Sequence, residues 1–446
     1  MLLRVLTVSF FFVFPSTRCQ TTESANITGD CSVCVDGEWQ KEEVILLSFA
    51  HQANTFCHIC QQRERWSRLA NDALDGRAES DPHWTPRQIA YMSELQNCKG
   101  RQCLKLIKGV TGDGRVVRKE YRVMSDYERH QFHYALTQLK RDMIDRFSKY
   151  DLFVKIHHPY FAPEAHIGPA FLPFHREYLK QLELALRQVN PNVSIPYWDS
   201  TLDEGLPDPA DSILWTPDFL GTARGPVVTG PFANWPSLIP IGYTGQNYLE
   251  RQVNTGSGAL YNPGNLNTIF YYFTTYSHFD ICVDPFFETI HGSVHQYIGG
   301  NMVETAVSPN DPLFFLFHSY VDQIWERWRM TRQDPYRRET EYSPFDRECH
   351  MHQSVQAHAP GRQMRPFAQL RNIDGLSESY TRELYTYQAA PTCNQQRTAC
   401  VPGSPYLFCH RGYGRCLSKI RRGGDCRGLE FEDSCLSSRC VNGRCM

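Results

Sequence analysis

The sequence predicts a mainly α-helical fold: a four-helix bundle with long loops, plus disulfide-rich N-terminal and C-terminal segments. Apolar residues recur at helical spacing in several long segments, as expected for helices packed around one core. His291 and His295 are four residues apart, which places both imidazoles on one face of a helix. Of the 17 cysteines, eight lie in the last 54 residues, where apolar residues are few. The length of 446 residues allows two or three domains.

The first helix of the bundle is predicted to begin after Ser125. The segment Ser125-Asp-Tyr-Glu128 is a capping box, in which the serine and the glutamate satisfy backbone N–H groups at the helix start. The apolar stripe that follows predicts a buried face made of Phe132, Leu136, Leu139, Met143 and Phe147. His130 and His133 belong to the same helix, and we expect both to face solvent.

Two further helices begin near histidines. After His175, apolar residues at helical spacing continue to Val189, and Asn190-Pro191 is a typical helix stop. After His318 the same spacing is found at Val321, Trp325 and Trp328. Each of these segments predicts a long helix with one buried face.

Irregular segments separate these helices. His166 lies between Pro163 and Pro169, so a loop is predicted there. Residues 200–290 are rich in Pro, Gly, Asn and Tyr, and we expect long loops with little regular structure that link two helical halves.

The chain divides into four predicted parts. They are a signal peptide at residues 1–19, a Cys-containing N-terminal region at 20–117, the helical central domain at 118–390 and a Cys-rich C-terminal module at 391–446. Arg4 followed by an apolar run from Val5 to Phe14 is typical of a secretory signal and is too short to cross a membrane. No other apolar stretch reaches about 18 residues. We therefore expect a secreted, extracellular protein without a membrane anchor.

The cysteines fit an oxidising compartment. If the signal ends after Cys19, 16 cysteines remain, an even number, as disulfides require. Disulfides must hold the C-terminal module, with a connectivity that the sequence leaves open, through Cys393, Cys400, Cys409, Cys416, Cys426, Cys435, Cys440 and Cys445. The pairs Cys31/Cys34 and Cys57/Cys60 have the spacing of a zinc site, but behind a signal peptide we favour disulfides.

Charge limits the possible partners. The formal net charge is -2, which argues against nucleic acid. From Cys393 to Met446 the chain is basic, with nine Lys and Arg against four Asp and Glu, and the remainder is acidic. This module is a stabilising cap, a solvated surface or an anchor on an acidic extracellular matrix. Two glycosylation sequons, at Asn26 and Asn192, agree with secretion.

Six histidines in two groups of three are the strongest functional signal. No cysteine or carboxylate accompanies them in a comparable ligand pattern. The first group is His157, His166 and His175, and the second is His291, His295 and His318. Neutral imidazole suits zinc, copper, iron and nickel. Because zinc has no redox chemistry, whereas two metals side by side can each give one electron to dioxygen, a paired all-imidazole site predicts two copper ions.

The motifs around these histidines resemble those of the tyrosinase family of type 3 copper proteins. They stand in order as Tyr150-Asp-Leu-Phe-Val-Lys-Ile-His157, Phe171-Leu-Pro-Phe-His175, His291-Gly-Ser-Val-His295 and Ser308-Pro-Asn-Asp-Pro-Leu-Phe-Phe-Leu-Phe-His318. The resemblance runs from about Arg118 to about Tyr387. It implies a tyrosinase-like dicopper domain that oxidises phenols or o-diphenols to quinones with dioxygen. Phenolic small molecules or tyrosyl and dopa side chains are the substrates implied, for extracellular cross-linking or pigmentation.

The remaining histidines are weaker candidates. The family motif places the ligand at His157 rather than at His158, which adjoins Pro159 and is expected to be exposed or to lie behind the ligands. His278 has no motif around it. His350, His352 and His358 form a His-rich loop, for which a plain polar loop is favoured over a weak surface metal site.

The resemblance also marks residues around the ligands. Gly292 stands where many active members have an asparagine that orients a water, and Gln296 stands where some have arginine. Phe317, where histidine is frequent, could narrow the entrance. Asp322 falls at an acidic position that orients a ligand or a neighbouring arginine. Because Gly292 offers no side chain, we expect o-diphenols to be oxidised faster than monophenols are hydroxylated, with Glu288 or Asp284 as the alternative base.

Two more positions follow from the resemblance. Some members carry a cysteine two residues before the second histidine and link the two covalently, but this chain has Glu164 there. The motif Tyr385-Thr-Tyr387 closes the family's catalytic domain by packing against an arginine, for which Arg118 or Arg122 would fit.

Two other classes of protein share the site. One is a reversible dioxygen carrier, and the other is a non-catalytic or weakly active extracellular matrix protein that keeps the fold. In organisation, the chain is most similar to secreted invertebrate tyrosinase-like proteins, including those of mollusc shells.

Overall fold

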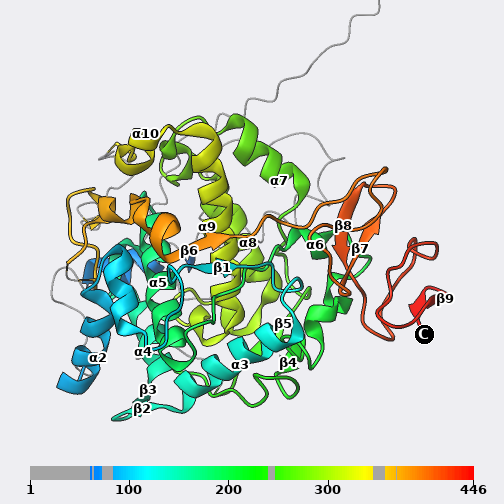
Figure 1. The fold of residues 1–446 in the computed structure, drawn as a ribbon, viewed down its shortest axis with the longest axis horizontal. Helices are drawn as coiled ribbons and strands as arrows, with labels where there is room; N and C mark the ends of the chain where they lie inside the picture. The colour runs from blue at the N-terminus through cyan, green and yellow to red at the C-terminus, as the bar shows by residue number, and fades with distance from the viewer. Residues whose placement is uncertain (1–60, 63–64, 73–83, 240–246, 345–356, 368) are drawn as a thin grey trace, which may run out of the picture.

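The computed structural model describes residues 61–62, 65–72, 84–239, 247–344, 357–367 and 369–446. Four helices occupy its centre: α4 (Lys149–Ile156), α5 (Phe171–Val189), α8 (Phe286–Ile298) and α9 (Leu313–Arg332) (Figure 1). α5 packs against α9 and against α3 (Asp126–Arg141), which in turn contacts α4. The mainly helical architecture with a central bundle is therefore confirmed.

The helices end where the sequence signals them, except in one case. The capping box at Ser125 forms as predicted, and α5 stops at Asn190. However, α3 ends at Arg141 instead of continuing through Met143 and Phe147. The chain instead turns at Asp145, whose φ of 58° suits an aspartate in a tight hairpin, between β2 (Met143–Ile144) and β3 (Phe147–Ser148). Met143 is consequently exposed.

A second capping signal explains why the chain turns there. The Ser148 side chain accepts a hydrogen bond from the backbone N–H of Asp151 and begins α4. The turn thus ends the first helix before Met143 and Phe147, and it leads into α4, which has the first ligand, His157, at its C-terminal end.

His133 contradicts the expectation that it faces solvent. It is buried on α3, and its Nε2 lies 2.6 Å from the hydroxyl of Tyr121. Burial lowers the pKa of His133 to about 3, so the ring is neutral at ordinary pH. His130, one turn earlier, is exposed as predicted.

The two ends of the central domain are joined by a short parallel sheet. β1 (Val116–Arg118) pairs with β6 (Tyr385–Tyr387). Arg118 donates a hydrogen bond of 2.9 Å to the hydroxyl of Tyr387, and its guanidinium lies 3.5 Å from the centre of the Tyr385 ring. Of the two arginines considered, Arg118 is therefore the partner of the tyrosine motif.

Little regular structure lies between α5 and α8, as predicted. The segment contains α6 (Thr201–Glu204), η4 (Pro209–Asp211), η5 (Ile213–Trp215), β4 (Arg224–Pro226), β5 (Glu250–Gln252), α7 (Pro263–Asn267), η6 (Thr268–Tyr272) and η7 (Tyr276–Phe279). The other short elements of the body are α2 (Pro86–Gln96), η2 (Gly100–Leu106), η3 (Pro163–Ala165), η8 (Gly300–Met302), η9 (Ser308–Asn310), α10 (Pro335–Thr340), η11 (Asn372–Leu376) and η12 (Tyr380–Leu384).

The C-terminal cysteines form two interlocked pairs of disulfides. Cys393 bonds to Cys409 and Cys400 to Cys416 around the hairpin of β7 (Leu407–His410) and β8 (Arg415–Ser418). Further along, Cys426 bonds to Cys440 and Cys435 to Cys445 beside β9 (Cys440–Val441) and β10 (Arg444–Cys445). All four disulfides are internal to the module, which forms the lobe at the right of Figure 1.

Several predictions fall outside the described residues. These are the signal peptide at 1–19, the cysteine pairs Cys31/Cys34 and Cys57/Cys60, and the histidines His350 and His352. In the N-terminal region, Cys98 and Cys103 are joined by a disulfide. Within the described ranges, no helix combines the length and the apolar character that crossing a membrane requires.

Candidate metal centre

Five of the six predicted ligands are on helices or at their ends. His157 is the residue that closes α4, and His175 lies in the first turns of α5. His291 and His295 share one face of α8, and His318 lies on α9. His166 follows the short turn η3 in an extended conformation, which confirms the predicted loop.

The first three histidines converge through their Nε2 atoms. The Nε2 of His157 lies 3.2 Å from that of His175 and 3.1 Å from that of His166. All three side chains are buried. They form a compact cluster of ring nitrogens that could bind one metal ion.

The second three repeat this arrangement. The Nε2 of His291 lies 3.1 Å from those of His318 and His295, and the last two are 3.3 Å apart. These rings are buried as well. The two clusters face each other, because the rings of His175 and His318 stack with their centres 4.2 Å apart.

Backbone carbonyl oxygens orient most of the rings. They accept hydrogen bonds from the outer ring nitrogens of four ligands: Thr305 from His157, Phe171 from His175, Met302 from His295 and Glu288 from His291. A carbonyl only accepts, so the proton is on Nδ1 and the lone pair of Nε2 is free for a metal. His318 lacks such a partner within the described residues and is packed between the rings of His175 and Phe314.

Electrostatics keeps the ligands neutral. Burial lowers the pKa of all six imidazoles, to about 3 for His175 and about 4 for His295. Lone pairs that meet at 3.1 to 3.3 Å repel one another unless a cation lies between them. Two clusters of three neutral imidazoles, which no thiolate or carboxylate from the described residues joins, therefore fit two copper ions.

A narrow cavity of about 50 Å³ adjoins the histidine clusters. Its lining consists of Gln62, Trp66, His166, Ile167, Ile281, Glu288, His291, Gly292, His295, Gln296, Val303 and Thr305. Gly292 and Gln296 are both in this lining, together with the ligands His291 and His295. Glu288 is also in this lining, whereas Asp284 is not.

Phe317 does not narrow this entrance. Its side chain is fully buried, and its ring is parallel to that of His291 with the two centres 5.4 Å apart. The Phe317 ring therefore packs against the His291 ring inside the core.

Trp66 is a part of the site that the sequence reasoning missed. Its ring lies edge-on to His166 with centres 4.6 Å apart, and its Nε1 donates to the carbonyl oxygen of Pro163. Arg65 fixes the same segment through a 2.7 Å ion pair with Glu304. No motif points to Trp66, because its role depends on a contact across about a hundred residues of chain.

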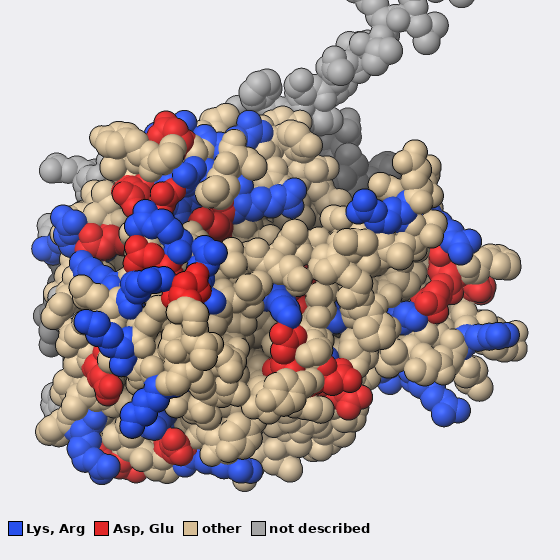
Figure 2. Space-filling model, in the orientation of Figure 1, with Lys and Arg blue, Asp and Glu red and all other residues tan. Residues whose placement is uncertain are grey.

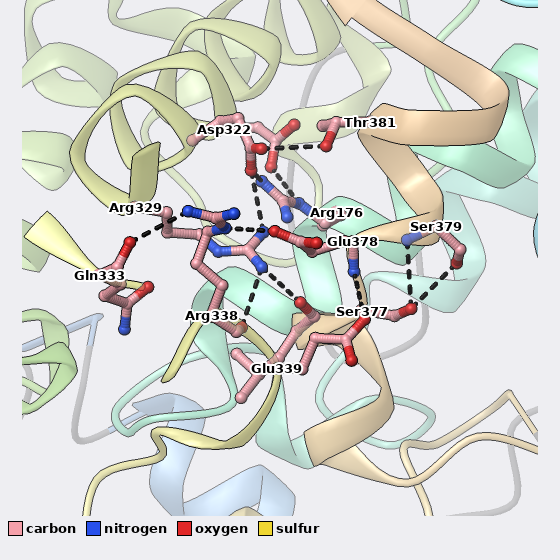
Figure 3. A network of polar contacts seen from close by, with 12 residues as sticks. Arg176, Asp322, Arg329, Gln333, Arg338, Glu339, Ser377, Glu378, Ser379 and Thr381 are labelled. Atoms are coloured by element: carbon pink, nitrogen blue, oxygen red, sulfur yellow. Dashed lines mark hydrogen bonds and ion pairs between the residues drawn. The ribbon is translucent and has the colours of Figure 1, made fainter. Parts of the chain in front are cut away.

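Asp322 orients an arginine, one of the two roles expected for it. It accepts hydrogen bonds from Arg176 at 2.7 Å and from the hydroxyls of Tyr385 and Tyr387 at 2.8 and 2.6 Å. Arg176 directly follows the ligand His175. Figure 3 shows Arg176 pointing towards Asp322 within a larger polar network that extends to Arg329 and Arg338.

Glu326 balances the charge of this network. It accepts from Arg176 at 2.7 Å and from Arg329 at 2.8 Å. Burial alone would raise the pKa of Glu326, but the two arginines lower it to about 2. Arg176 and Arg329, which are both buried, therefore have an ionised partner in Glu326.

Two other predicted positions are placed by the structure. Glu164 is buried, and burial raises its pKa to about 8. Its carboxyl accepts from the backbone N–H of Arg365, so it supports a neighbouring loop. His358 is buried, and its ring lies against Gly168, which contradicts a surface role for this member of the His-rich loop.

Comparisons with known proteins agree with this centre. The family model for the common central domain of tyrosinase matches residues 147–331, which contain all six histidines. A tyrosinase-like protein of Caenorhabditis elegans is 37% identical over 431 residues, covering 87% of this chain and 58% of that protein. Tyrosinase-like protein 2 of Margaritifera margaritifera is 32% identical over 365 residues, covering 77% of this chain and 76% of that protein.

These findings define a type 3 copper fold, and the chain belongs to the tyrosinase family. It spans little more than half of the nematode relative, at 58% of that protein's length. Among solved structures, a mutant of the polyphenol oxidase from Thermothelomyces thermophila superimposes with a TM-score of 0.51 at 19% identity. That match covers 70% of this chain and 99% of the other, and it supports the shared fold.

Proposed function

We propose that the protein is a secreted copper oxidase that converts phenols, above all o-diphenols, to quinones with dioxygen. The convergence of six Nε2 atoms in two facing clusters is the observation that supports this most directly. When bound, a copper pair supplies one electron from each metal to dioxygen. Two o-diphenols each lose two electrons and two protons, and one dioxygen becomes two waters.

The cavity supports a preference for o-diphenols. A monophenol must lose a proton whose pKa is about 10, so its hydroxylation needs a base or an oriented water. Gly292 has no side chain with which to orient a water, and Gln296 is a neutral amide. A diphenol is more acidic and chelating, so its oxidation depends less on such a group.

Substrate entry requires side chains to move. The cavity of about 50 Å³ is smaller than typical ligand sites, which measure about 300 to 1,000 Å³. Gln62, Trp66 and Gln296 line it and are the groups whose rotation would admit a phenolic ring. Free phenols and tyrosyl or dopa side chains on a flexible chain are the substrates that this opening favours.

Oxygen uptake by the copper-loaded protein tests the activity. With catechol, we expect steady uptake of one dioxygen for every two quinones formed, and slower uptake with a monophenol. A dioxygen carrier would bind dioxygen reversibly without consuming it, and a non-catalytic matrix protein would do neither. The apoprotein serves as the control, since every copper-dependent signal must vanish with the metal.

An extracellular role in cross-linking or pigmentation completes the proposal. The disulfides of the C-terminal module and of Cys98–Cys103 support an oxidising compartment. N-terminal sequencing of protein collected from the medium of expressing cells should begin after Cys19. Protein that stays inside the cells with residues 1–19 attached would contradict secretion.

For the C-terminal module, a role as a stabilising cap is better supported than a role as an anchor on an acidic extracellular matrix. Arg415 pairs with Glu204 at 2.9 Å and Arg421 with Asp211 at 2.6 Å, so acidic residues of the body neutralise part of its positive charge. On the face drawn in Figure 2, acidic residues lie among the basic residues of the lobe at the right. Attachment to an acidic extracellular matrix stays a prediction, tested by salt-sensitive binding to an acidic polysaccharide.

A further inference from the structure

His166 is the ligand with the least local support. No helix holds it, and its ring nitrogen Nδ1 has no backbone carbonyl as hydrogen-bond partner among the contacts of the described residues. The next residue, Ile167, has a φ of 67°, which a β-branched residue rarely adopts. The backbone beside the ligand is therefore strained, and such strain persists only where surrounding contacts impose it.

Glu288 provides such a contact from the other half of the centre. It lies on α8, three residues before His291, and is 6% exposed. Its Oε1 accepts a hydrogen bond of 2.9 Å from the backbone N–H of Ile167, and the same oxygen lies 3.6 Å from Nδ1 of His166. The carboxylate thus touches the strained residue and faces the outer edge of the ligand ring.

The backbone of Glu288 serves the second cluster at the same time. Its carbonyl oxygen accepts from the ring of His291. One residue therefore contacts a ligand of each cluster, through the carboxylate for the His166 loop and through the carbonyl for His291. Glu164, two residues before His166, points its carboxyl to Arg365 and does not hold the ring.

We propose that Glu288 is a positioning residue for the first copper, fixing the His166 loop to the helix that carries the second. The inference rests on the copper centre described above and adds a role outside its six ligands. Partners of metal ligands typically contribute about 10- to 100-fold to metal affinity. Removing the carboxylate should weaken the first copper and leave the second unchanged, because the backbone carbonyl remains.

Copper titration of single-site proteins resolves the two positions. His295→Ala restricts tight binding to the first cluster, and His175→Ala restricts it to the second. Each is combined with Glu288→Ala, and Cu(I) affinity is measured by competition with a colorimetric chelator. We expect a loss of about 10- to 100-fold in the first background and no change in the second.

Two further variants separate positioning from folding. Glu288→Gln keeps an oxygen that accepts from Ile167 and should retain most of the affinity. Ile167→Gly added to Glu288→Ala should recover part of it, because glycine adopts a φ of 67° without strain. Glu204→Ala removes a carboxylate that is paired with Arg415 and is absent from the cavity lining, and it is the control.

The outcomes are distinguishable. Equal loss at both clusters, or a loss that Ile167→Gly and Glu288→Gln do not relieve, would overturn the positioning role and leave a structural one. Unchanged affinity at the first cluster in Glu288→Ala would overturn it outright. If the unmodified protein bound no copper at all, the failure would belong to the copper centre itself.

Discussion

The rings of His175 and His318 stack almost parallel, with an angle of 14° between their planes and their centres 4.2 Å apart. One comes from α5 and the other from α9, so the packing of these two helices sets the separation of the two histidine clusters. The fold and the metal centre are therefore connected, because whatever fixes α5 against α9 also fixes the distance between the two sets of ligands that would hold the coppers.

Gly292→Asn should raise monophenol hydroxylation relative to o-diphenol oxidation. The new amide would lie in the lining of the cavity beside His291, where it can orient a water that accepts the phenolic proton. The ratio of initial rates on a monophenol and its matching o-diphenol measures the effect, and we expect an increase of about tenfold, as removal of a proton-transfer barrier of about 1.4 kcal/mol gives. Brisk hydroxylation by the unmodified protein, unaltered by the substitution, would show that another residue supplies the base.

Asp322→Ala should destabilise the protein by about 1 to 3 kcal/mol, the usual cost of leaving buried hydrogen-bond donors without their acceptor, because Arg176 keeps its ion pair with Glu326. Arg176 and the hydroxyls of Tyr385 and Tyr387 all lose their shared acceptor. Urea unfolding of the apoprotein measures the change. Asp374→Ala, which removes the partner of the largely exposed Arg371, is the control and should cost less than about 1 kcal/mol. A comparable loss in both variants would contradict a special role for Asp322.

His133 should make the protein less stable in acid. The pKa of His133 is about 3 in the folded state, below the ordinary histidine value of 6.5. Between these two pH values, His133 is protonated in the unfolded chain and neutral in the folded protein. The contribution of His133 is thus complete above about pH 6.5 and is lost as the pH falls, by about 2 kcal/mol at pH 5.

His133→Gln should remove this part of the pH dependence while preserving a polar partner for Tyr121. Unfolding free energies of the apoproteins at pH 7.5 and pH 5 give the comparison. His130→Gln, an exposed change on the same helix, should follow the unmodified protein. If all three proteins lost equal stability in acid, the buried ring would not be the cause.

Deleting residues 391–446 should lower stability without removing copper. Leu206 of the body packs against Phe408, Leu417 and Ile420 of the module, and burial of such a side chain contributes about 1.5 to 3 kcal/mol. The cavity lining contains no residue of the module, so we expect the copper content and the oxidation rate to stay close to those of the full chain. A large rise in activity after deletion would instead mean that the module shields the centre.

Most of the fold and of the site could be predicted from local signals in the sequence. The capping box at Ser125, the spacing of His291 and His295 and the helix stop at Asn190 each depend on neighbours in the chain. The ligands of both clusters were predictable for the same reason, since each lies within its own short motif.

Long-range contacts explain what the sequence did not predict. His133 is buried in contact with Tyr121, Trp66 packs against the first cluster at His166, and Phe317 packs against His291. None of these follows from spacing along the chain. The disulfide pairing also required the structure, because eight cysteines allow 105 connectivities. The early end of α3 does have a local signal, because Ser148 is a capping residue that begins α4.

Copper content is the measurement that tests the central claim most directly. Metal analysis of the purified, copper-loaded protein should give about two coppers per chain, and the absorption should change when dioxygen is added. His175→Ala should keep about one, because two imidazoles cannot complete the first cluster while the second is intact. One metal per chain in the unmodified protein, or zinc at full occupancy of both clusters, would contradict the account.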